Sequence, residues 1–337
     1  LVQRQPGRRR RIDHILWPRD GSVLGAADDN QQMTYGDLNR CSDNLAQFLL
    51  LNGLSPGDKA VVQLPNTCDV YICFFALLKA GIKAVFPVFS HRKIEIESYI
   101  GQLEAKLMIF SRQHELFKTD EYLLQLKKEK PSLNLIIGHD PKQTSNESSF
   151  FQLKPCYQTG FMDYKLNYSY FRGLDVAFYQ LSGGSTGTPK LIPRTHEDYF
   201  YSIKKSCEVC EINQSTKYLC VLPASHNFAL SSPGVLGVLF SGGTAVLSLS
   251  PALLHVADLI KIHKIDLTAL VPTVVNQWID AFKPEKYDLT SLKRIQIGGA
   301  KLSNVNAYRI EEILSVTIQQ VYGMAEGLVC YTEWCDD

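Results

Sequence analysis

Apolar residues recur along most of this chain in two alternating patterns. Short apolar runs have the length and composition of buried strands, and the segments between them carry apolar residues at helical spacing. In the first half the predicted strands are 59–64, 82–88 and 106–110. The predicted helices are one capped by Thr34 and stopped at Gly53, one over 66–81 that ends at a glycine, and one over 92–104. Such alternation predicts a parallel sheet covered by helices on both faces.

The alternation of strands and helices is interrupted at 140–173, a polar segment with little periodicity, and it resumes afterwards. The strands predicted in the second run are 176–181, 217–222, 244–249, 266–271, 294–297 and 317–322. We therefore expect an α/β protein with a subdomain boundary near residue 172. The expected parts are a poorly ordered or non-native segment 1–29, a first α/β subdomain 30–172 and a second 173–337.

Composition narrows the class of protein. The hydrophobic content of 45% and charged content of 20% are those of a soluble globular chain. A net charge of +1 favours neither nucleic acid nor a membrane surface as a partner. The longest apolar runs, such as 71–78, are too short to span a bilayer. Nine scattered cysteines fit reduced thiols, so we expect a cytoplasmic protein.

A loop of glycines and hydroxyl residues follows the strand predicted at 176–181. It consists of Ser182, Gly183, Gly184, Ser185, Thr186, Gly187 and Thr188, and Lys190 comes shortly after it. Glycines let the backbone turn its N–H groups inward, and hydroxyls add donors, which suits a phosphate-binding loop better than a linker. The loop is not a Walker A motif, because Thr188 and Pro189 separate Gly187 from Lys190. It is not a dinucleotide fingerprint either, because Gly183 and Gly184 are adjacent.

The stretch SGGSTGTPK resembles the phosphate-binding signature of the adenylate-forming enzymes, which include acyl-CoA synthetases, luciferases and the adenylation domains of peptide synthetases. Three later strand ends resemble motifs of the same family: PASHNFALSSPG at 223–234, IGGAK at 297–301 and QVYGMAEG at 320–327. Together with Ser90-His91-Arg92, they most resemble the 2,3-dihydroxybenzoate–AMP ligases of catechol siderophore pathways. The resemblance covers roughly 30–332 and implies a large N-terminal domain built from two stacked α/β subdomains.

The resemblance also implies a role for individual residues. His226 and Lys190 would be catalytic, and 182–188 with Lys190 would hold the ATP phosphates. The adenine would be bound by Gly299, Ala300, Val321, Tyr322, Gly323 and Met324. The aryl acid would be bound by His226, Asn227, Phe228, Ser232, Gly298, Ala325 and Val329. Glu326 would hold Mg²⁺, which needs few protein ligands when phosphate oxygens and water supply the rest.

The implied reaction joins 2,3-dihydroxybenzoate to ATP, giving aryl-AMP and pyrophosphate. The aryl group would then pass to a phosphopantetheine thiol on the aryl carrier protein of a siderophore peptide synthetase. The amide of Asn227 suits a hydroxylated ring, whereas an amino acid substrate would need a carboxylate for its ammonium group. Two alternatives stay open: a ligase that joins salicylate or another aryl acid to AMP or CoA, and a non-catalytic fragment that binds nucleotide or aryl acid.

The chain departs from the family at both ends. Enzymes of the family continue into a ribose-binding Asp, a hinge and a small C-terminal lid domain with a catalytic Lys, and the sequence stops before these parts. The arginine-rich start and 333–337 also differ from the subfamily. Losing positioned cationic stabilisation typically lowers a rate by two to three orders of magnitude, about 3–4 kcal/mol. We therefore expect ligand binding with little turnover from this chain alone.

Overall fold

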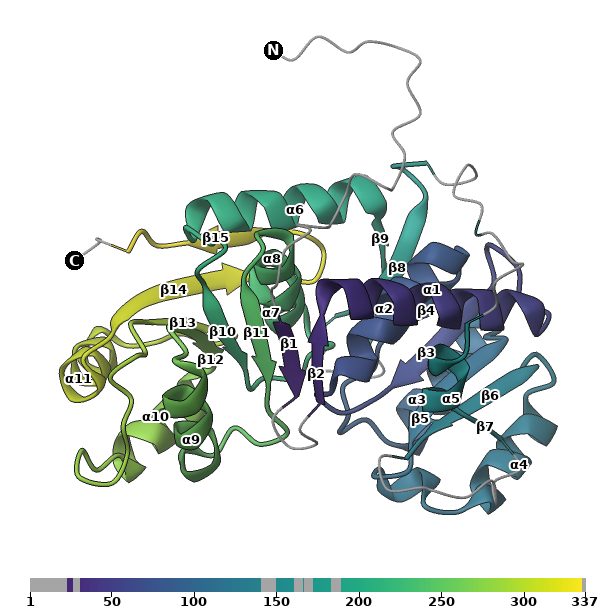
Figure 1. Cartoon of the computed structure of the whole chain (residues 1–337), viewed down its shortest axis with the longest axis horizontal. Helices are drawn as coiled ribbons and strands as arrows, with labels where there is room; N and C mark the ends of the chain where they lie inside the picture. The colour runs from purple at the N-terminus through teal and green to yellow at the C-terminus, as the bar shows by residue number, and fades with distance from the viewer. Residues whose placement is uncertain are drawn as a thin grey trace, which may run out of the picture.

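Two mostly parallel β-sheets and the helices around them form the α/β fold (Figure 1). The computed structural model describes residues 23–26, 31–140, 150–160, 166, 172–182 and 189–334. No helix within these ranges is long and apolar enough to cross a membrane.

The first sheet has seven strands in the order β7-β6-β5-β3-β4-β8-β9, and only the edge pair β8–β9 is antiparallel. Its strands are β3 (Lys59–Gln63), β4 (Lys83–Val85), β5 (Leu107–Ser111), β6 (Leu135–His139), β7 (Phe151–Gln152), β8 (Val176–Leu181) and β9 (Leu191–Thr195). The accompanying helices are α1 (Tyr35–Leu51), α2 (Cys68–Ala80), α3 (Lys93–Leu103), the 3₁₀ turn η2 (Glu115–Phe117), α4 (Asp120–Glu129) and α5 (Leu153–Gln158).

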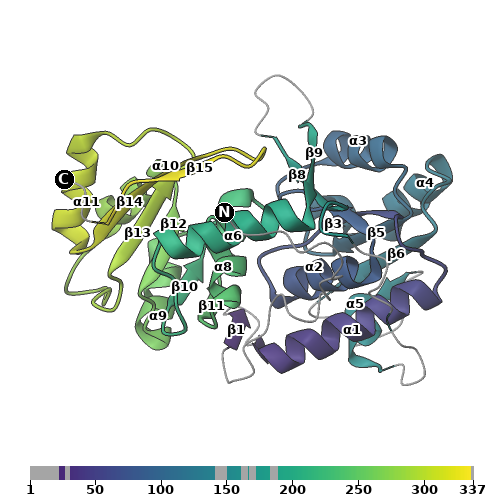
Figure 2. The same cartoon turned by 90° about the horizontal axis from the view of Figure 1, so that it is seen from above.

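Helices cover both faces of this sheet (Figure 2). Val61 and Met108 pack with α3 and α4, whereas Val62 and Ile109 belong to the core that contains α1 and α2. Successive residues of a strand point to opposite faces, so a sheet buried on both faces needs the continuous apolar runs seen in the sequence.

The second sheet has eight strands in the order β15-β14-β13-β12-β10-β11-β1-β2, with antiparallel pairs only at its two edges. Its strands are β1 (Val23–Ala26), β2 (Gln31–Thr34), β10 (Lys217–Cys220), β11 (Thr244–Leu247), β12 (Leu267–Leu270), β13 (Arg294–Gly298), β14 (Thr317–Gly323) and β15 (Val329–Tyr331). Its helices are α6 (His196–Val209), α7 (Asn227–Ser231), α8 (Gly234–Phe240), α9 (Leu253–His263), α10 (Pro272–Ala281) and α11 (Asn304–Leu314).

The helices predicted in the first half are confirmed, with their local signals. Thr34 caps α1 by accepting a hydrogen bond from the backbone N–H of Asp37, 3.0 Å away. Thr67 is the N-cap residue of α2, and Gly81 ends that helix in the left-handed conformation at φ 72°. These boundaries were predictable because capping depends on residues close in sequence.

The strands are shared between the sheets differently from the expected division at residue 172. β8, expected to open the second α/β run, pairs with β4 and lies in the first sheet, with β9 at its edge. Conversely, β1 and β2 lie at the edge of the second sheet, although Val23–Ala26 falls within the segment expected to be poorly ordered or non-native. The chain therefore crosses between the sheets more than once.

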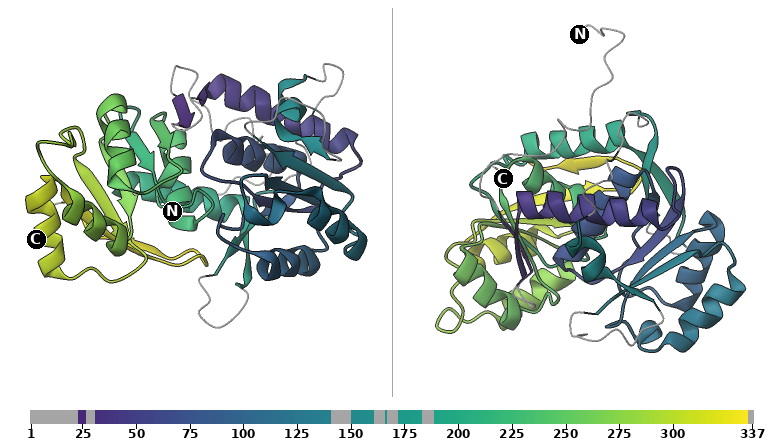
Figure 3. Two further views of the ribbon diagram at one scale, coloured as in Figure 1. Left: turned by 90° about the horizontal axis from the view of Figure 1, so that it is seen from below. Right: turned by 45° about the vertical axis from the view of Figure 1, so that its right-hand side comes forward.

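The two sheets lie side by side and share one core (Figures 2 and 3). Helix α2 of the first sheet contacts β1 and β2 of the second. Asn66, in the loop before α2, donates hydrogen bonds to the carbonyl oxygens of Leu222 and Ser248 at 2.8 and 3.0 Å. It also accepts one from the backbone N–H of Ala224 at 2.7 Å. One side chain thus ties the first sheet to the ends of β10 and β11.

Candidate active site

A cavity of about 500 Å³ opens where strands of both sheets end. It is bordered by residues after β4, at the end of β8, in the loop after β10, and at the ends of β13 and β14. The lining residues are Phe86, Val88, His91, Gln180, Leu181, Ser182, Pro189, Ser225, His226, Asn227, Phe228, Ser232, Gly298, Gly299, Val321, Gly323, Met324, Ala325, Glu326 and Val329. The carboxyl ends of parallel strands are the usual place for ligands in open α/β sheets.

The two ends of the expected phosphate loop are held together at the cavity edge. The backbone N–H of Ser182 donates to the carbonyl oxygen of Lys190 at 3.0 Å. The backbone N–H of Lys190 donates to the hydroxyl oxygen of Ser182 at 2.9 Å. The Lys190 side chain is exposed. Residues 183–188 of the loop (Gly183, Gly184, Ser185, Thr186, Gly187 and Thr188) lie outside the described residues, so their role stays a prediction.

The loop after β10 is anchored to the first half of the chain before it reaches His226. Besides the Asn66 bond to Ala224, the hydroxyl of Ser225 donates to the carbonyl oxygen of Pro87 at 3.4 Å. His226 then caps α7, because its Nδ1 accepts from the backbone N–H of Phe228 at 3.3 Å. These contacts bring His226, Asn227 and Phe228 onto one wall of the cavity.

His226 is held as a neutral imidazole. Part of the ring is open to the cavity, but protein atoms on its other sides exclude water and lower the pKa of His226. With Nδ1 accepting a hydrogen bond, the proton of the neutral ring is on Nε2. His226 can therefore donate one hydrogen bond to an oxygen of a bound ligand.

Two glycines shape the cavity beside β13. A Cβ atom on Gly298 would lie 2.7 Å from the carbonyl oxygen of Val321 and 3.2 Å from the Phe228 ring, so only glycine fits without a shift. Gly299 has a φ of 81°, which favours glycine. A second cavity of about 550 Å³ adjoins here, lined by Ile297, Gly299, Ala300, Lys301, Gln320, Val321, Tyr322, Gly323, Cys330, Tyr331 and Thr332.

Glu326 lies in a turn between β14 and β15 that borders the first cavity. The turn is closed by the backbone N–H of Met324, which donates to the carbonyl oxygen of Leu328 at 2.9 Å. Glu326 is exposed and makes no salt bridge with another described residue. A carboxylate without a salt-bridge partner among the described residues suits Mg²⁺, which prefers oxygen ligands. Phosphate groups and water molecules supply most of the other oxygen ligands of this ion. Among the described residues, three or more His, Cys, Asp or Glu side chains nowhere gather as a metal cluster.

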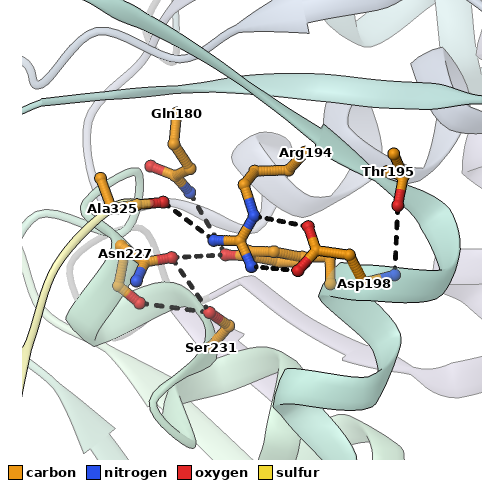
Figure 4. A network of polar contacts seen from close by, with 8 residues as sticks. Gln180, Arg194, Thr195, Asp198, Asn227, Ser231 and Ala325 are labelled. Atoms are coloured by element: carbon orange, nitrogen blue, oxygen red, sulfur yellow. Dashed lines mark hydrogen bonds and ion pairs between the residues drawn. The ribbon is translucent and has the colours of Figure 1, made fainter. Parts of the chain in front are cut away.

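A network of polar contacts joins residues of β9 and α6 to residues that line the cavity (Figure 4). The guanidinium of Arg194 in β9 pairs with Asp198, at 2.7 and 2.9 Å, and donates to the carbonyl oxygen of Ala325 at 2.9 Å. Tyr199 of α6 donates to Oδ1 of Asn227 at 3.1 Å and accepts from the amide of Gln180 at 3.2 Å. Residues on β8, β9 and α6 thus support residues that line the cavity.

The hydroxyl of Ser232 has a similar support. Tyr331 of β15 hydrogen-bonds Ser206 of α6 at 2.7 Å and also Ser232. Burial raises the pKa of Tyr331, so its hydroxyl stays protonated and can donate. Tyr199 and Ser206 are seven residues apart, so they lie on the same face of α6.

The structure brings together most of the residues predicted for the site. All seven predicted aryl-acid residues line the first cavity: His226, Asn227, Phe228, Ser232, Gly298, Ala325 and Val329. Of the residues predicted for adenine, Gly299, Val321 and Gly323 border both cavities, Ala300 and Tyr322 border the second, and Met324 borders the first. Their ligands stay predictions.

Other lining residues carried no chemical signal in the sequence. Phe86 and Val88 come from the end of a predicted strand, where they resemble ordinary core residues. Gln180 fits an alternating strand in the sequence and is otherwise unmarked. His91 belongs to the triplet that resembles the subfamily, but the sequence predicts no role for it.

Comparison with known proteins agrees with this arrangement. A family model described as AMP-binding enzyme matches residues 2–337. Enterobactin synthase component E of Escherichia coli (strain K12) is 44% identical over 315 residues, which are 93% of this chain and 57% of that protein. The 2,3-dihydroxybenzoate-AMP ligase of Bacillus subtilis (strain 168) is 41% identical over 317 residues, which are 94% of this chain and 57% of that protein. The chain thus spans 57% of the length of both curated relatives.

A solved structure shows the same fold. The apo structure of MbtA from Mycobacterium smegmatis superposes with a TM-score of 0.82 at 32% identity, covering 94% of this chain and 56% of that one. The expected α/β architecture with two mostly parallel sheets is confirmed.

Proposed function

The chain belongs to the AMP-binding enzyme family, and from this premise we propose that it forms the substrate-binding part of a 2,3-dihydroxybenzoate–AMP ligase. The observation that carries the proposal is the cavity of about 500 Å³ between the ends of the two sheets. It combines an apolar wall for a ring with an amide, a hydroxyl, a neutral imidazole and the carboxylate of Glu326, which pairs with no other described residue. A hydroxylated aryl acid beside a phosphate group matches that set.

The proposed reaction forms one bond and breaks one. A carboxylate oxygen of the acid attacks the α-phosphorus of ATP, the bond to the bridging oxygen breaks, and pyrophosphate leaves with the electron pair. No proton has to be transferred. The residues' task is therefore to position the reactants and to balance charge.

Individual residues would divide this task. His226 would donate from Nε2 to the carboxylate and hold it in line with phosphorus. Asn227 and Ser232 would bind the ring hydroxyls, with Phe228 against the ring face. Lys190 and the loop that it closes would balance the charge of the β- and γ-phosphates. Glu326 would hold Mg²⁺, which when bound neutralises phosphate oxygens.

The product would serve a second step and a protein partner. We propose that the aryl-AMP passes its aryl group to a phosphopantetheine thiol of a carrier protein for siderophore synthesis, in the cytoplasm. The names of the relatives, an enterobactin synthase component and a 2,3-dihydroxybenzoate ligase, support this setting. The free thiols of the described cysteines, most of them buried, are compatible with a reducing compartment.

Equilibrium binding and isotope exchange test the proposal separately. Calorimetry with 2,3-dihydroxybenzoate, salicylate and benzoate should rank the acids in that order, because each lost hydroxyl leaves a polar group of the cavity unpaired. ATP–pyrophosphate exchange that depends on 2,3-dihydroxybenzoate and disappears in Lys190→Ala would show adenylation by this chain. If the folded chain bound all three acids equally, or bound none of them, the aryl-acid assignment would be wrong. A preference for salicylate would indicate a salicylate ligase.

A further inference from the structure

A buried tyrosine lies directly behind Asn227. Tyr199 of α6 is 4% exposed, and its hydroxyl is 3.1 Å from Oδ1 of Asn227. The hydroxyl of Ser231, itself 1% exposed, is 3.3 Å from the same oxygen (Figure 4). Two buried hydroxyl groups thus converge on one end of the Asn227 amide.

The direction of these hydrogen bonds follows from the proton count. A tyrosine hydroxyl has one proton to donate. The amide of Gln180 donates to the Tyr199 oxygen at 3.2 Å, and the hydroxyl of Ser231, which also donates to the backbone oxygen of Asn227 at 3.4 Å, hydrogen-bonds Tyr199 as well. The Tyr199 proton is directed to Oδ1 of Asn227 at 3.1 Å. Burial raises the pKa of Tyr199, which keeps that proton in place at neutral pH.

The Tyr199 ring is held in place by its packing. The guanidinium carbon of Arg194 lies 4.8 Å from the centre of the ring, and its charge is balanced by Asp198. Phe178 packs edge-on against the other part of the ring, with centroids 4.6 Å apart, so the tyrosine has little room to move.

The opposite end of the amide is available to a ligand. Within the described part of the chain, the NH₂ group of Asn227 makes no hydrogen bond to protein, and Asn227 lines the cavity. A donor with no protein partner at a cavity wall can donate to an acceptor on a ligand.

We propose that Tyr199 is a positioning residue that fixes the hydrogen-bond polarity of the cavity, so that Asn227 presents donors to an oxygen on the ring of the acid. This inference rests on the proposed function and adds a rule of substrate choice. A ring hydroxyl beside the carboxylate can accept from Asn227. A ring amino group at the same place is a poor acceptor, because its lone pair is delocalised into the ring, and its N–H groups would face those of Asn227.

The test compares salicylate with anthranilate, which differ only in carrying a hydroxyl or an amino group. Calorimetric affinities for both acids and for benzoate are measured for the chain as given and for Tyr199→Phe. Phenylalanine keeps the packing on Phe178 and Arg194 but removes the hydroxyl that holds Asn227. We expect the unaltered chain to prefer salicylate to anthranilate about tenfold or more, as expected for one unpaired buried group. Tyr199→Phe should lower that ratio about tenfold and leave benzoate affinity within about twofold.

Tyr35→Phe is the matched control. Tyr35 is also buried, and its hydroxyl donates to the carbonyl oxygen of Gly243 at 2.8 Å, away from the cavity. Tyr35→Phe should lower the stability of the fold, as Tyr199→Phe does. It should leave the ratio of salicylate to anthranilate affinity unchanged. If Tyr199→Phe does not fold, Ser231→Ala provides the same comparison, with a smaller fall in the ratio.

Three results would overturn the inference. The first is an unchanged ratio in Tyr199→Phe and in Ser231→Ala. The second is a preference of the unaltered chain for anthranilate, which would mean that Asn227 presents its oxygen to the ligand. The third is an unaltered chain that binds no aryl acid, which would overturn the proposed function as well.

Discussion

Gly298 shows how one missing side chain shapes the proposed binding site. It ends β13, beside β14 and below the Phe228 ring, and it lines the cavity. Its φ is not in the left-handed region, so the backbone alone does not require glycine. The requirement comes from space, because a Cβ would lie 2.7 Å from the carbonyl oxygen of Val321. The size of the cavity thus depends on a residue that touches a ligand only through its backbone.

We predict that Gly298→Ala weakens aryl-acid binding about tenfold and destabilises the fold by about 1–3 kcal/mol. The added Cβ would force either strand β14 or the Phe228 ring to shift into the cavity. Gly101→Ala is the control, since the nearest atom to its Cβ would be Lys130 Nζ at 3.7 Å. That change lies in helix α3 and should stabilise by about 0.5–1 kcal/mol. Calorimetry and urea unfolding measure both. An unchanged acid affinity in Gly298→Ala would mean that the ring does not lie against β13.

At the scale of elements, β9 and α6 connect the β8–β9 hairpin with the far side of the cavity. Arg194 leaves β9 and reaches the carbonyl oxygen of Ala325, which is 131 positions away in sequence and directly before Glu326. Its side chain is 2% exposed, whereas that of Asp198, its partner, is 47% exposed. The guanidinium therefore fixes the turn that carries the proposed Mg²⁺ ligand.

We predict that Arg194→Ala lowers the affinity for Mg·ATP about tenfold and the free energy of unfolding by roughly 2–4 kcal/mol. Arg112→Ala is a matched control, because Arg112 pairs with Asp120, donates to the carbonyl oxygen of Phe117 at 2.9 Å and lies over the Phe110 ring. It makes the same three kinds of contact away from the cavity, so it should lose stability but not nucleotide affinity. Equal loss of Mg·ATP affinity in both variants would show that Arg194 acts only through stability.

Helices and strands could be predicted from the sequence where the residues that determine them lie close together in the chain. The caps of α1 and α2 and the buried strands can be read directly from the sequence. Capping, and the alternation of side chains along a strand, depend only on residues close together in the chain. The sequence pattern predicts the wrong sheet for β8, because the pairing of Phe178 with Ala84 joins segments far apart in the chain. The same limit applies to the site. Lining residues within motifs were found, but Arg194 and Tyr199 carry no local sign of the groups that they hold.

At the scale of the whole molecule, Asn66 is one of the side chains whose polar contacts couple the two sheets, as Arg194 and Ser225 also do. Its amide makes three hydrogen bonds, to Leu222, Ala224 and Ser248, all in the second half. These contacts lie at the carboxyl ends of β10 and β11, immediately before the loop that carries His226. The joint between the sheets and the proposed catalytic loop are therefore held by the same side chain.

We predict that Asn66→Asp uncouples the two halves. The carboxylate has nearly the shape of the amide but no N–H groups, so it would face the carbonyl oxygens of Leu222 and Ser248 without donors. The expected loss is roughly 2–4 kcal/mol, because two acceptors lose their partners and a charge is partly buried. The described tryptophans, Trp278 and Trp334, both lie in the half built on the second sheet. In a Trp17→Phe background their fluorescence should therefore report that half, whereas circular dichroism reports both.

Urea unfolding in that background should give coincident midpoints by the two probes, and Asn66→Asp should separate them and weaken aryl-acid binding. Asn44→Asp is the control, because the Asn44 amide donates to the carbonyl oxygen of Tyr157 at 2.9 Å within the first half. It should lower stability without separating the probes or changing acid affinity. If Asn66→Asp unfolded in one transition with unchanged acid affinity, the shared apolar core and the other polar contacts between the sheets would be enough to couple them. The position of His226 would then be set by strand β10, which precedes its loop, and not by the Asn66 hydrogen bonds.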